Sequence, residues 1–273
     1  MGRVVDTHVH LSQRDDDELN QYARKNGLRY TLAELLGLMR KNGVAHALLL
    51  SPPLKGGIPL PNEEILSLCK KTNRKLLPVL TVEPNAKDVS AALRIAERNR
   101  EVKAFKIRLG YTKACAQSPV FDRLYEYAEA EGVPVLFHTG DTATSTGRLL
   151  LSHPLTLDGL ANAREDLRIV LCHFGNPWFE DAAELLYKHP NVYADISGLT
   201  TGGSKYAERY MDWLANKISQ AVYFAGGAEK ILFGTDYPVT TYADALSLVE
   251  KMKIDRRDKE LILSRNAARV FGI

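Results

Sequence analysis

The feature that most constrains the fold of this chain is a regular alternation of short apolar runs with longer amphipathic stretches. Eight runs rich in Leu, Val and Ile recur along the 273 residues. Strand–helix units repeated in this way build a parallel sheet covered by helices. Because a parallel α/β barrel takes about 250 residues, we predict one domain over residues 1–273, a (β/α)8 TIM barrel of the α/β class. The predicted strands are Val4 to His8, Val44 to Leu50, Leu76 to Thr81, Val102 to Leu109, Val133 to His138, Arg168 to His173, Asn191 to Ile196 and Lys230 to Asp236.

Helix-end signals support the alternation. Thr31 and Glu34 form a capping box, and Gly132 is placed to end the helix that starts near Ser118-Pro119. The tail from Asp255 to Phe271 predicts an extra C-terminal helix, which we expect to pack on the outside of the barrel. Two long connections follow strands, from Leu11 to Tyr30 and from Thr139 to Leu151. In a barrel they would lie on the catalytic face and could act as lids.

Composition excludes several classes of protein. The 36 Lys and Arg residues are spread against 33 Asp and Glu, without a basic block, so nucleic acid is not an expected partner. The cysteines Cys69, Cys115 and Cys172 are odd in number and widely spaced, which argues against a disulfide framework and favours a reducing cytoplasm. No charged leader with an apolar region precedes the first strand, and no apolar run approaches 18 residues. We therefore expect neither export nor a membrane span.

Histidines gather where the predicted strands end. Four of the seven, His8, His10, His138 and His173, end apolar runs, and Asp236 ends the last run. The carboxyl ends of barrel strands meet at one rim, so these side chains should form one metal or catalytic site. Strand alternation puts Asp6, His8 and His10 on one face, with Val5, Thr7 and Val9 on the other. His-x-His at a strand end can thus give one metal two nitrogen ligands.

The same alternation places the remaining candidates. It groups Leu171 with His173 and turns Cys172 outward, as a buried, inert thiol. It also puts Lys106 and Arg108 on one face of the fourth strand, near the barrel mouth. Arg is well shaped to hold a carboxylate, which indicates an anionic substrate bound by these two cations. Lys106 could equally be one half of a buried ion pair.

Taken together, these residues resemble the amidohydrolase superfamily, most closely the amidohydrolase-related (amidohydrolase 2) branch, which includes aminocarboxymuconate-semialdehyde and aromatic-acid decarboxylases. The likeness runs through nearly the whole chain. The matching segments are Asp6-Thr7-His8-Val9-His10-Leu11, Phe105-Lys106-Ile107, Val135-Leu136-Phe137-His138-Thr139-Gly140, Leu171-Cys172-His173-Phe174-Gly175, Asn191-Val192-Tyr193-Ala194-Asp195 and Gly234-Thr235-Asp236-Tyr237-Pro238.

This resemblance implies one divalent metal, usually zinc. Its ligands would be His8, His10, His138 and Asp236, and His173 would stand beside the metal-bound water as base or electrophile. Asp236 would also accept a proton from that water. Some superfamily members carbamylate a lysine of the fourth strand to bridge two metals. This branch usually holds one metal, so the resemblance makes Lys106 an electrostatic or substrate-orienting group. Relatives are often dimers, which makes a homodimer an option.

Simpler structural roles compete with these assignments. His46, His153 and His189 are expected to be structural, and Trp178 and Phe179 to serve packing. Asp6 could orient a ligand histidine or simply accept backbone hydrogen bonds. For function, we expect a metal-dependent hydrolase of a small, carboxylate-bearing substrate, acting on a C–N or C–O bond with metal-activated water. The alternatives are a non-oxidative decarboxylase that uses the same site and a non-catalytic barrel that binds a ligand or metal.

Overall fold

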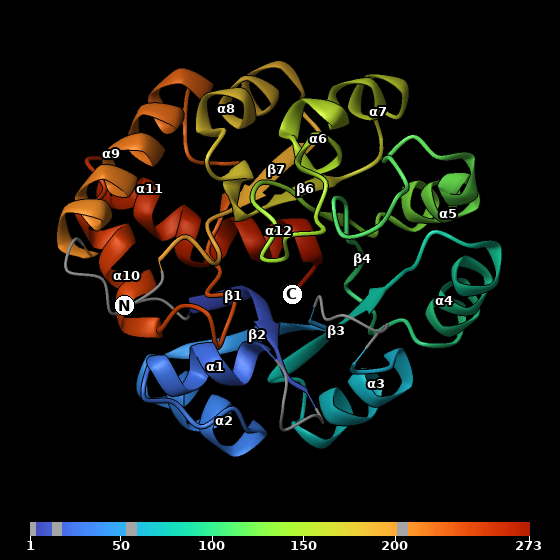
Figure 1. Ribbon diagram of the computed structural model, residues 1–273, viewed down its shortest axis with the longest axis horizontal. Helices are drawn as coiled ribbons and strands as arrows, with labels where there is room; N and C mark the ends of the chain where they lie inside the picture. The colour runs from blue at the N-terminus through green and yellow to red at the C-terminus, as the bar shows by residue number, and fades with distance from the viewer. Residues whose placement is uncertain (1–3, 13–17, 53–58, 201–206) are drawn as a thin grey trace.

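Eight parallel strands form one sheet in the order β1 to β8, and helices surround it (Figure 1). The computed structural model describes residues 4–12, 18–52, 59–200 and 207–273. Backbone contacts join the last strand region to the first, with Thr7 N–H donating to Phe233 O and a bridge between Val9 and Tyr237. The predicted (β/α)8 barrel is therefore confirmed. The strands are β1 (Val4–His10), β2 (Val44–Leu50), β3 (Leu76–Thr81), β4 (Ala104–Ile107), β5 (Val135–His138), β6 (Ile169–Cys172), β7 (Val192–Asp195) and β8 (Ile231–Leu232).

The helices follow the strands around the ring. The α-helices are α1 (Glu18–Lys25), α2 (Leu32–Lys41), α3 (Asn62–Lys71), α4 (Ala86–Arg98), α5 (Asp122–Glu131), α6 (Leu149–Ser152), α7 (Asp158–Ala163), α8 (Phe179–Lys188), α9 (Ala207–Ala225), α10 (Tyr242–Lys251), α11 (Arg256–Glu260) and α12 (Asn266–Phe271). The predicted helix ends are confirmed at two places. Thr31 Oγ1 accepts the Glu34 N–H at 3.2 Å, and Gly132 ends α5 with a φ of 63°.

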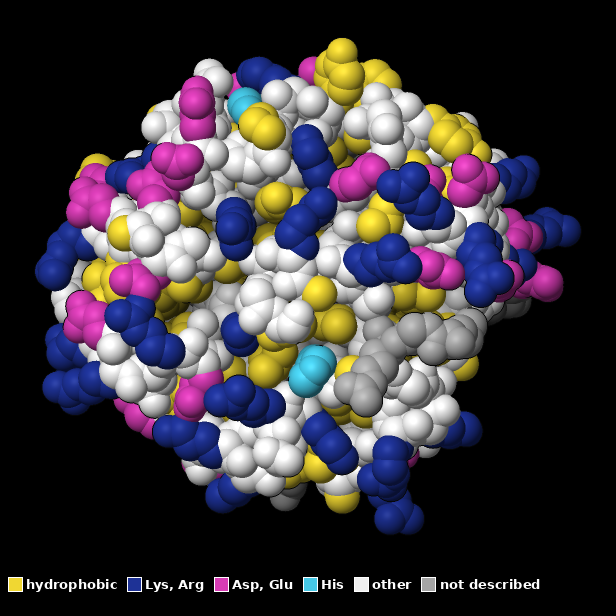
Figure 2. Space-filling view, turned by 180° about the vertical axis from the view of Figure 1, so that it is seen from behind, with side chains coloured by type: hydrophobic (Ala, Val, Ile, Leu, Met, Phe, Trp, Pro, Cys, Tyr) yellow, Lys and Arg dark blue, Asp and Glu magenta, His cyan; other side chains and the backbone are white. Residues whose placement is uncertain are grey.

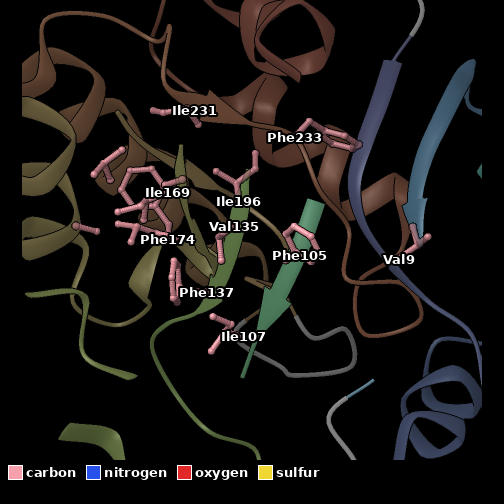
Figure 3. Close-up of a cluster of buried hydrophobic side chains, with 14 of the residues drawn as sticks. Val9, Phe105, Ile107, Val135, Phe137, Ile169, Phe174, Ile196, Ile231 and Phe233 are labelled. Carbon is pink, nitrogen blue, oxygen red and sulfur yellow. The ribbon is translucent and has the colours of Figure 1, made fainter. Parts of the chain in front are cut away.

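The buried apolar residues form two clusters, one outside the barrel wall and one inside it. The larger cluster lies between strands and helices, where Phe105 and Ile107 of β4 lie beside Val135 and Phe137 of β5 (Figure 3). The smaller cluster fills the barrel and combines strand residues such as Val5, Leu48, Ala104, Leu136 and Val170 with residues of α12.

The C-terminal tail closes one end of the barrel. Ala267, Val270 and Phe271 of α12 belong to the inner cluster together with Val5 and Leu77, which lie near the first residues of their strands. The helix therefore covers the amino ends of the strands. The predicted C-terminal helix is confirmed, because α11, a π-helical turn over Leu261–Arg265 and α12 follow one another without a break. The expectation that it packs on the outside of the barrel was wrong for α12, which joins the inner cluster.

A β-bulge changes the alternation in β1. Asp6 pairs with Ala47 and Val9 with Leu49, so three steps of β1 lie opposite two steps of β2. Val5 consequently joins the inner cluster while Val9 joins the outer one. Asp6 accepts a hydrogen bond from Thr235 Oγ1 at 2.6 Å. The predicted grouping of Asp6 with His8 and His10 was thus wrong, because strict alternation does not continue through a bulge.

The end of β6 departs from the prediction in a similar way. Cys172 belongs to the inner cluster and Leu171 to the outer one, so the thiol points into the barrel and not away from it. His173 lies beyond the strand and has a φ of 62°, followed by Phe174 at 49°. This left-handed turn brings His173 back to the barrel mouth, although its neighbour Cys172 already faces inward.

Charges of both signs occur on the face seen from behind. Lys and Arg side chains lie among Asp and Glu at its left and right edges, and Lys and Arg predominate along its lower edge (Figure 2). No helix within the described part of the chain has both the length and the apolar character needed to cross a bilayer.

Candidate active site

The carboxyl ends of the strands surround a cavity of about 310 Å³. Helix α1 contributes Leu19 and Tyr22 to its wall, and the long connection after β5 contributes Asp141 and Ala143. Both of the connections expected on the catalytic face therefore reach this cavity. Every residue predicted for the site lines it as well: His8, His10, Lys106, Arg108, His138, His173 and Asp236.

Three of these residues bring ligand atoms close together. The ligand atoms of His8, His10 and Asp236 lie within 4.8 Å of one another. Asp236 Oδ1 is 2.9 Å from His10 Nε2 and 3.6 Å from His8 Nε2. Asp236 is held in a left-handed conformation, with a φ of 58°, and its N–H donates to His8 O. The segment that follows β8 is thus bound directly to the strand that carries both histidines.

The hydrogen-bond partners of His10 test whether a metal fits. Its Nδ1 lies 3.1 Å from Leu50 O, and its Nε2 faces the Asp236 carboxylate. Both partners only accept hydrogen bonds, and a neutral imidazole carries a single N–H. A metal ion bound between His10 and Asp236 would satisfy both the His10 Nε2 lone pair and the Asp236 carboxylate, while the single N–H of the ring binds Leu50 O. Two imidazole nitrogens and one carboxylate oxygen are suitable donors for zinc.

His138 lies in the same cavity but outside this group of three. Its Nε2 is 2.8 Å from Asp141 O, and its ring centroid is 4.9 Å from that of His173. Tyr111 packs edge-on against the same ring at 4.7 Å, and its hydroxyl accepts the Ala143 N–H. The connection after β5 therefore fixes the orientation of His138.

A second cluster of potential ligands lies deeper. His8, Cys172 and Asp195 also bring their ligand atoms within 4.8 Å. Here, however, Lys106 Nζ lies 2.7 Å from Cys172 Sγ, and burial raises the pKa of the Cys172 thiol well above its usual range. A protonated thiol is a poor metal ligand. The cavity-facing group is therefore the better candidate for a metal.

Asp195 and Ser197, at the end of β7, connect two of the histidines. Asp195 Oδ2 is 3.1 Å from His8 Nδ1, and Oδ1 accepts the His173 N–H at 2.9 Å. Ser197 Oγ lies 3.2 Å from His8 Nδ1 and 3.0 Å from His173 Nδ1. Sequence reasoning assigned no role to either residue, although Asp195 ends the segment Asn191–Asp195 that resembles the family, which was the available signal.

Gly198 permits this arrangement. Its φ is 66°, and a Cβ there would lie 2.7 Å from Asp236 Oδ2 and 3.1 Å from His173 Nδ1. A side chain at this position would push apart the two residues that we regard as catalytic candidates.

The electrostatics of the site suit metal binding at neutral pH. Burial, reinforced by the charge of Lys106 and opposed by Asp195, lowers the pKa of His8 to about 4. Burial acts to raise the pKa of Asp236, but the hydrogen bond from His10 and the neighbouring histidine charges outweigh it and lower that pKa to about 2. His8 is then neutral and Asp236 ionised, which are the forms that coordinate a metal.

The two cations of β4 differ in how far they are neutralised. The Arg108 guanidinium forms an ion pair with Glu83, and its Nη1 donates to Pro52 O at 3.2 Å. Lys106 is 4% exposed and has no carboxylate partner among the residues that the structure describes. The alternative of a buried ion pair thus applies to Arg108 rather than to Lys106.

Comparison with known proteins gives a family and a fold. The family described as Amidohydrolase matches residues 5–273. A TIM-barrel protein of uncharacterised function from Bordetella bronchiseptica superposes with a TM-score of 0.78 at 19% identity, covering 99% of this chain and 98% of that one. A probable 2-pyrone-4,6-dicarboxylic acid hydrolase from Acinetobacter baumannii gives 0.70 at 18% identity, with 99% and 100% covered.

A dihydroxybenzoic acid decarboxylase from Polaromonas sp. JS666, with bound manganese and 2-nitroresorcinol, gives a TM-score of 0.69 at 15% identity, covering 100% of this chain and 97% of that one. None of the curated proteins matches this sequence. At these identities the structural likeness concerns the fold alone.

Proposed function

The chain belongs to the amidohydrolase family of enzymes, and from that premise we propose that it is a metal-dependent hydrolase of small, carboxylate-bearing substrates, acting on a C–N or C–O bond. The observation that carries the proposal is the close approach of Asp236 Oδ1 to His8 Nε2 and His10 Nε2, three donor atoms that could hold one metal ion. Catalysis by such enzymes depends on a water molecule made reactive at neutral pH.

We assign one zinc ion to His8, His10, His138 and Asp236. Three imidazoles and one carboxylate are a zinc-like donor set, and Asp195 and Leu50 O hold the Nδ1 atoms of His8 and His10. When bound, zinc lowers the pKa of a water ligand to about 7 and so supplies a nucleophile.

The side chains around the proposed zinc site have separate roles. Asp236 accepts the proton of the attacking water, and His173 exchanges a proton with the substrate from the neighbouring wall of the cavity. Lys106 binds the substrate carboxylate, because it is a buried cation without a carboxylate partner in the described chain. Leu19, Tyr22, Tyr111 and Leu199 provide apolar walls that limit access of bulk water.

The runner-up is a non-oxidative decarboxylase at the same site. The observation in its favour is that Lys106, His173 and Asp236 line one small cavity, so the bound carboxylate itself would lie next to proton-carrying groups. The reaction class then depends on which end of the substrate faces the metal ligands.

A substrate screen separates these functions. The zinc-loaded protein is assayed for carbon dioxide release from aromatic and unsaturated acids and for hydrolysis of lactones, esters and amides that carry a carboxylate. Hydrolysis that is lost on chelation and restored by zinc supports the proposal. Carbon dioxide release without hydrolysis establishes the runner-up, and stoichiometric metal without any turnover supports a non-catalytic binding barrel.

We also propose a cytoplasmic location. All three cysteines are free thiols, with Cys69 and Cys172 buried and Cys115 exposed, as suits a reducing compartment.

A further inference from the structure

Asp195 is a buried carboxylate that does not line the cavity, yet it touches two residues that do. Its Oδ2 faces His8 Nδ1 at 3.1 Å. Its Oδ1 accepts three hydrogen bonds, from His173 N at 2.9 Å, from Ser197 N at 3.0 Å and from Ser197 Oγ. All three partners of Oδ1 are fixed donors, and this allows the remaining protons around the carboxylate to be assigned.

The hydroxyl of Ser197 has only one proton, and Asp195 Oδ1 receives it. Ser197 Oγ can then only accept from the imidazoles. His173 Nδ1 lies 3.0 Å from this Oγ and 3.1 Å from the backbone carbonyl oxygen of Ser197, so every partner of His173 Nδ1 is an acceptor. The partners of His8 Nδ1, which are Asp195 Oδ2 and Ser197 Oγ, are acceptors as well.

We propose that Asp195, acting with Ser197, is a positioning residue that keeps the protons of His8 and His173 on Nδ1 and so presents both Nε2 lone pairs to the cavity. This inference deepens the proposed function and rests on it for its chemical meaning. The Nε2 lone pair of His8 is then available to bind the metal. The Nε2 lone pair of His173 makes the neutral ring a proton acceptor, which favours the role of base over that of electrophile, the two roles that the sequence left open.

The backbone keeps this relation rigid. The left-handed turn at His173 places its N–H on Asp195 Oδ1, while its ring reaches Ser197. Gly198 then lets the chain pass within contact of His173 Nδ1 and Asp236. A single carboxylate at the end of β7 thereby fixes a ring on β1 and a ring after β6.

The first test reads the tautomers directly. Long-range proton–nitrogen NMR spectra of the metal-free protein at pH 8 distinguish Nδ1–H from Nε2–H imidazoles, and the variants His8→Gln and His173→Gln assign the two signals. We expect Nδ1–H for both rings. An Nε2–H tautomer at either ring overturns the proposal, and no variant of Asp195 has to fold for this result to count.

The second test changes one atom of the carboxylate. In Asp195→Asn the amide oxygen should take the Oδ1 position, because three donors point there, which leaves the NH2 group facing His8 Nδ1. His8 should then switch to Nε2–H while His173 stays Nδ1–H, and zinc affinity should fall by roughly 10- to 100-fold. Asp166→Asn, at an exposed position, is the matched control and should change neither tautomer nor affinity.

The outcomes separate this inference from the proposed function. Both rings as Nδ1–H, without turnover of any substrate, would remove the hydrolase and leave the role of Asp195 intact. Turnover together with an unchanged His8 tautomer in Asp195→Asn would remove the role of Asp195 and leave the hydrolase intact.

Discussion

The two ends of the barrel interior contain different kinds of side chain. At the amino end, Val270 and Phe271 of α12 pack on apolar strand residues, and Asn266 Nδ2 donates to Ala228 O and Ile231 O. At the carboxyl end, imidazoles and a carboxylate face one another around a cavity. One end therefore holds the fold together, whereas the other keeps buried ionisable groups that cost stability until a ligand binds.

The largest effect is expected from removing both ligands on β1. In the variant His8→Ala with His10→Ala, bound metal should fall to zero and turnover to background, because Asp236 and His138 alone cannot hold the ion. Elemental analysis and a turnover assay measure both, on protein that circular dichroism shows to be folded. Metal retained at one ion per folded chain would remove the proposed role of the carboxyl end.

Removing the proposed base should act on rate alone. His173→Asn should reduce turnover by about 10²- to 10⁴-fold, the usual contribution of general acid–base catalysis, and leave most of the metal bound. Steady-state kinetics and metal content are measured on the same preparation. Complete loss of metal in this variant would falsify the assignment of His173 as a non-ligand.

A substitution at the amino end of the barrel should lower stability and leave metal binding unchanged. Phe271 is 5% exposed within the inner cluster, so Phe271→Ala should lower the free energy of unfolding by about 3–5 kcal/mol. Metal stoichiometry and KM should be unchanged at temperatures where the variant is folded. Leu150→Ala, at an exposed position, is the control. Lost metal binding in the folded Phe271 variant would mean that the two ends are coupled.

The two cations of β4 allow a finer test within the carboxyl end. Lys106→Met should raise KM for an acidic substrate by about 10- to 100-fold, because a charge-assisted hydrogen bond contributes roughly 1.5–3 kcal/mol. Arg108→Met should have the smaller effect on KM, since Glu83 already neutralises that guanidinium. Equal effects, or a larger one at Arg108, would reverse the assignment of the carboxylate-binding residue.

The smallest effect is expected outside both ends, on the outer helices. Hydrogen bonds from Lys188 and His189 lower the pKa of Asp158. Because the pKa is lower in the folded state, this stabilisation is present above the unfolded pKa of about 3.9 and disappears as pH falls through the folded value. Asp158→Asn should cost less than about 1 kcal/mol at pH 7 because the pair is solvent-screened. In urea titrations the difference from wild type should shrink as the pH falls below the unfolded pKa.

The sequence was sufficient for the parts of the fold that follow simple periodicity. The bounds of β2 and β3 were predicted to the residue, and all seven predicted site residues line one cavity. Alternation failed at the bulge in β1 and at Cys172, because both depend on pairing and backbone conformation at strand ends.

Other features of the site could not be predicted from the sequence, for a different reason. The left-handed turn at His173 and the hydrogen bonds of Asp195 and Ser197 join residues far apart in the chain. No local pattern encodes such contacts. The neutralisation of Arg108 by Glu83 likewise depends on neighbouring strands, so sequence reasoning treated the two β4 cations alike.

The central claim is that His8, His10 and Asp236 share one divalent cation, and metal titration tests it most directly. The chelated protein is titrated with zinc by calorimetry, in parallel with Asp236→Asn and the His8, His10 double variant. The account predicts one zinc ion per wild-type chain, weaker binding in Asp236→Asn and none in the double variant. Zinc binding of equal affinity in the double variant, or its absence from the wild type, would contradict it.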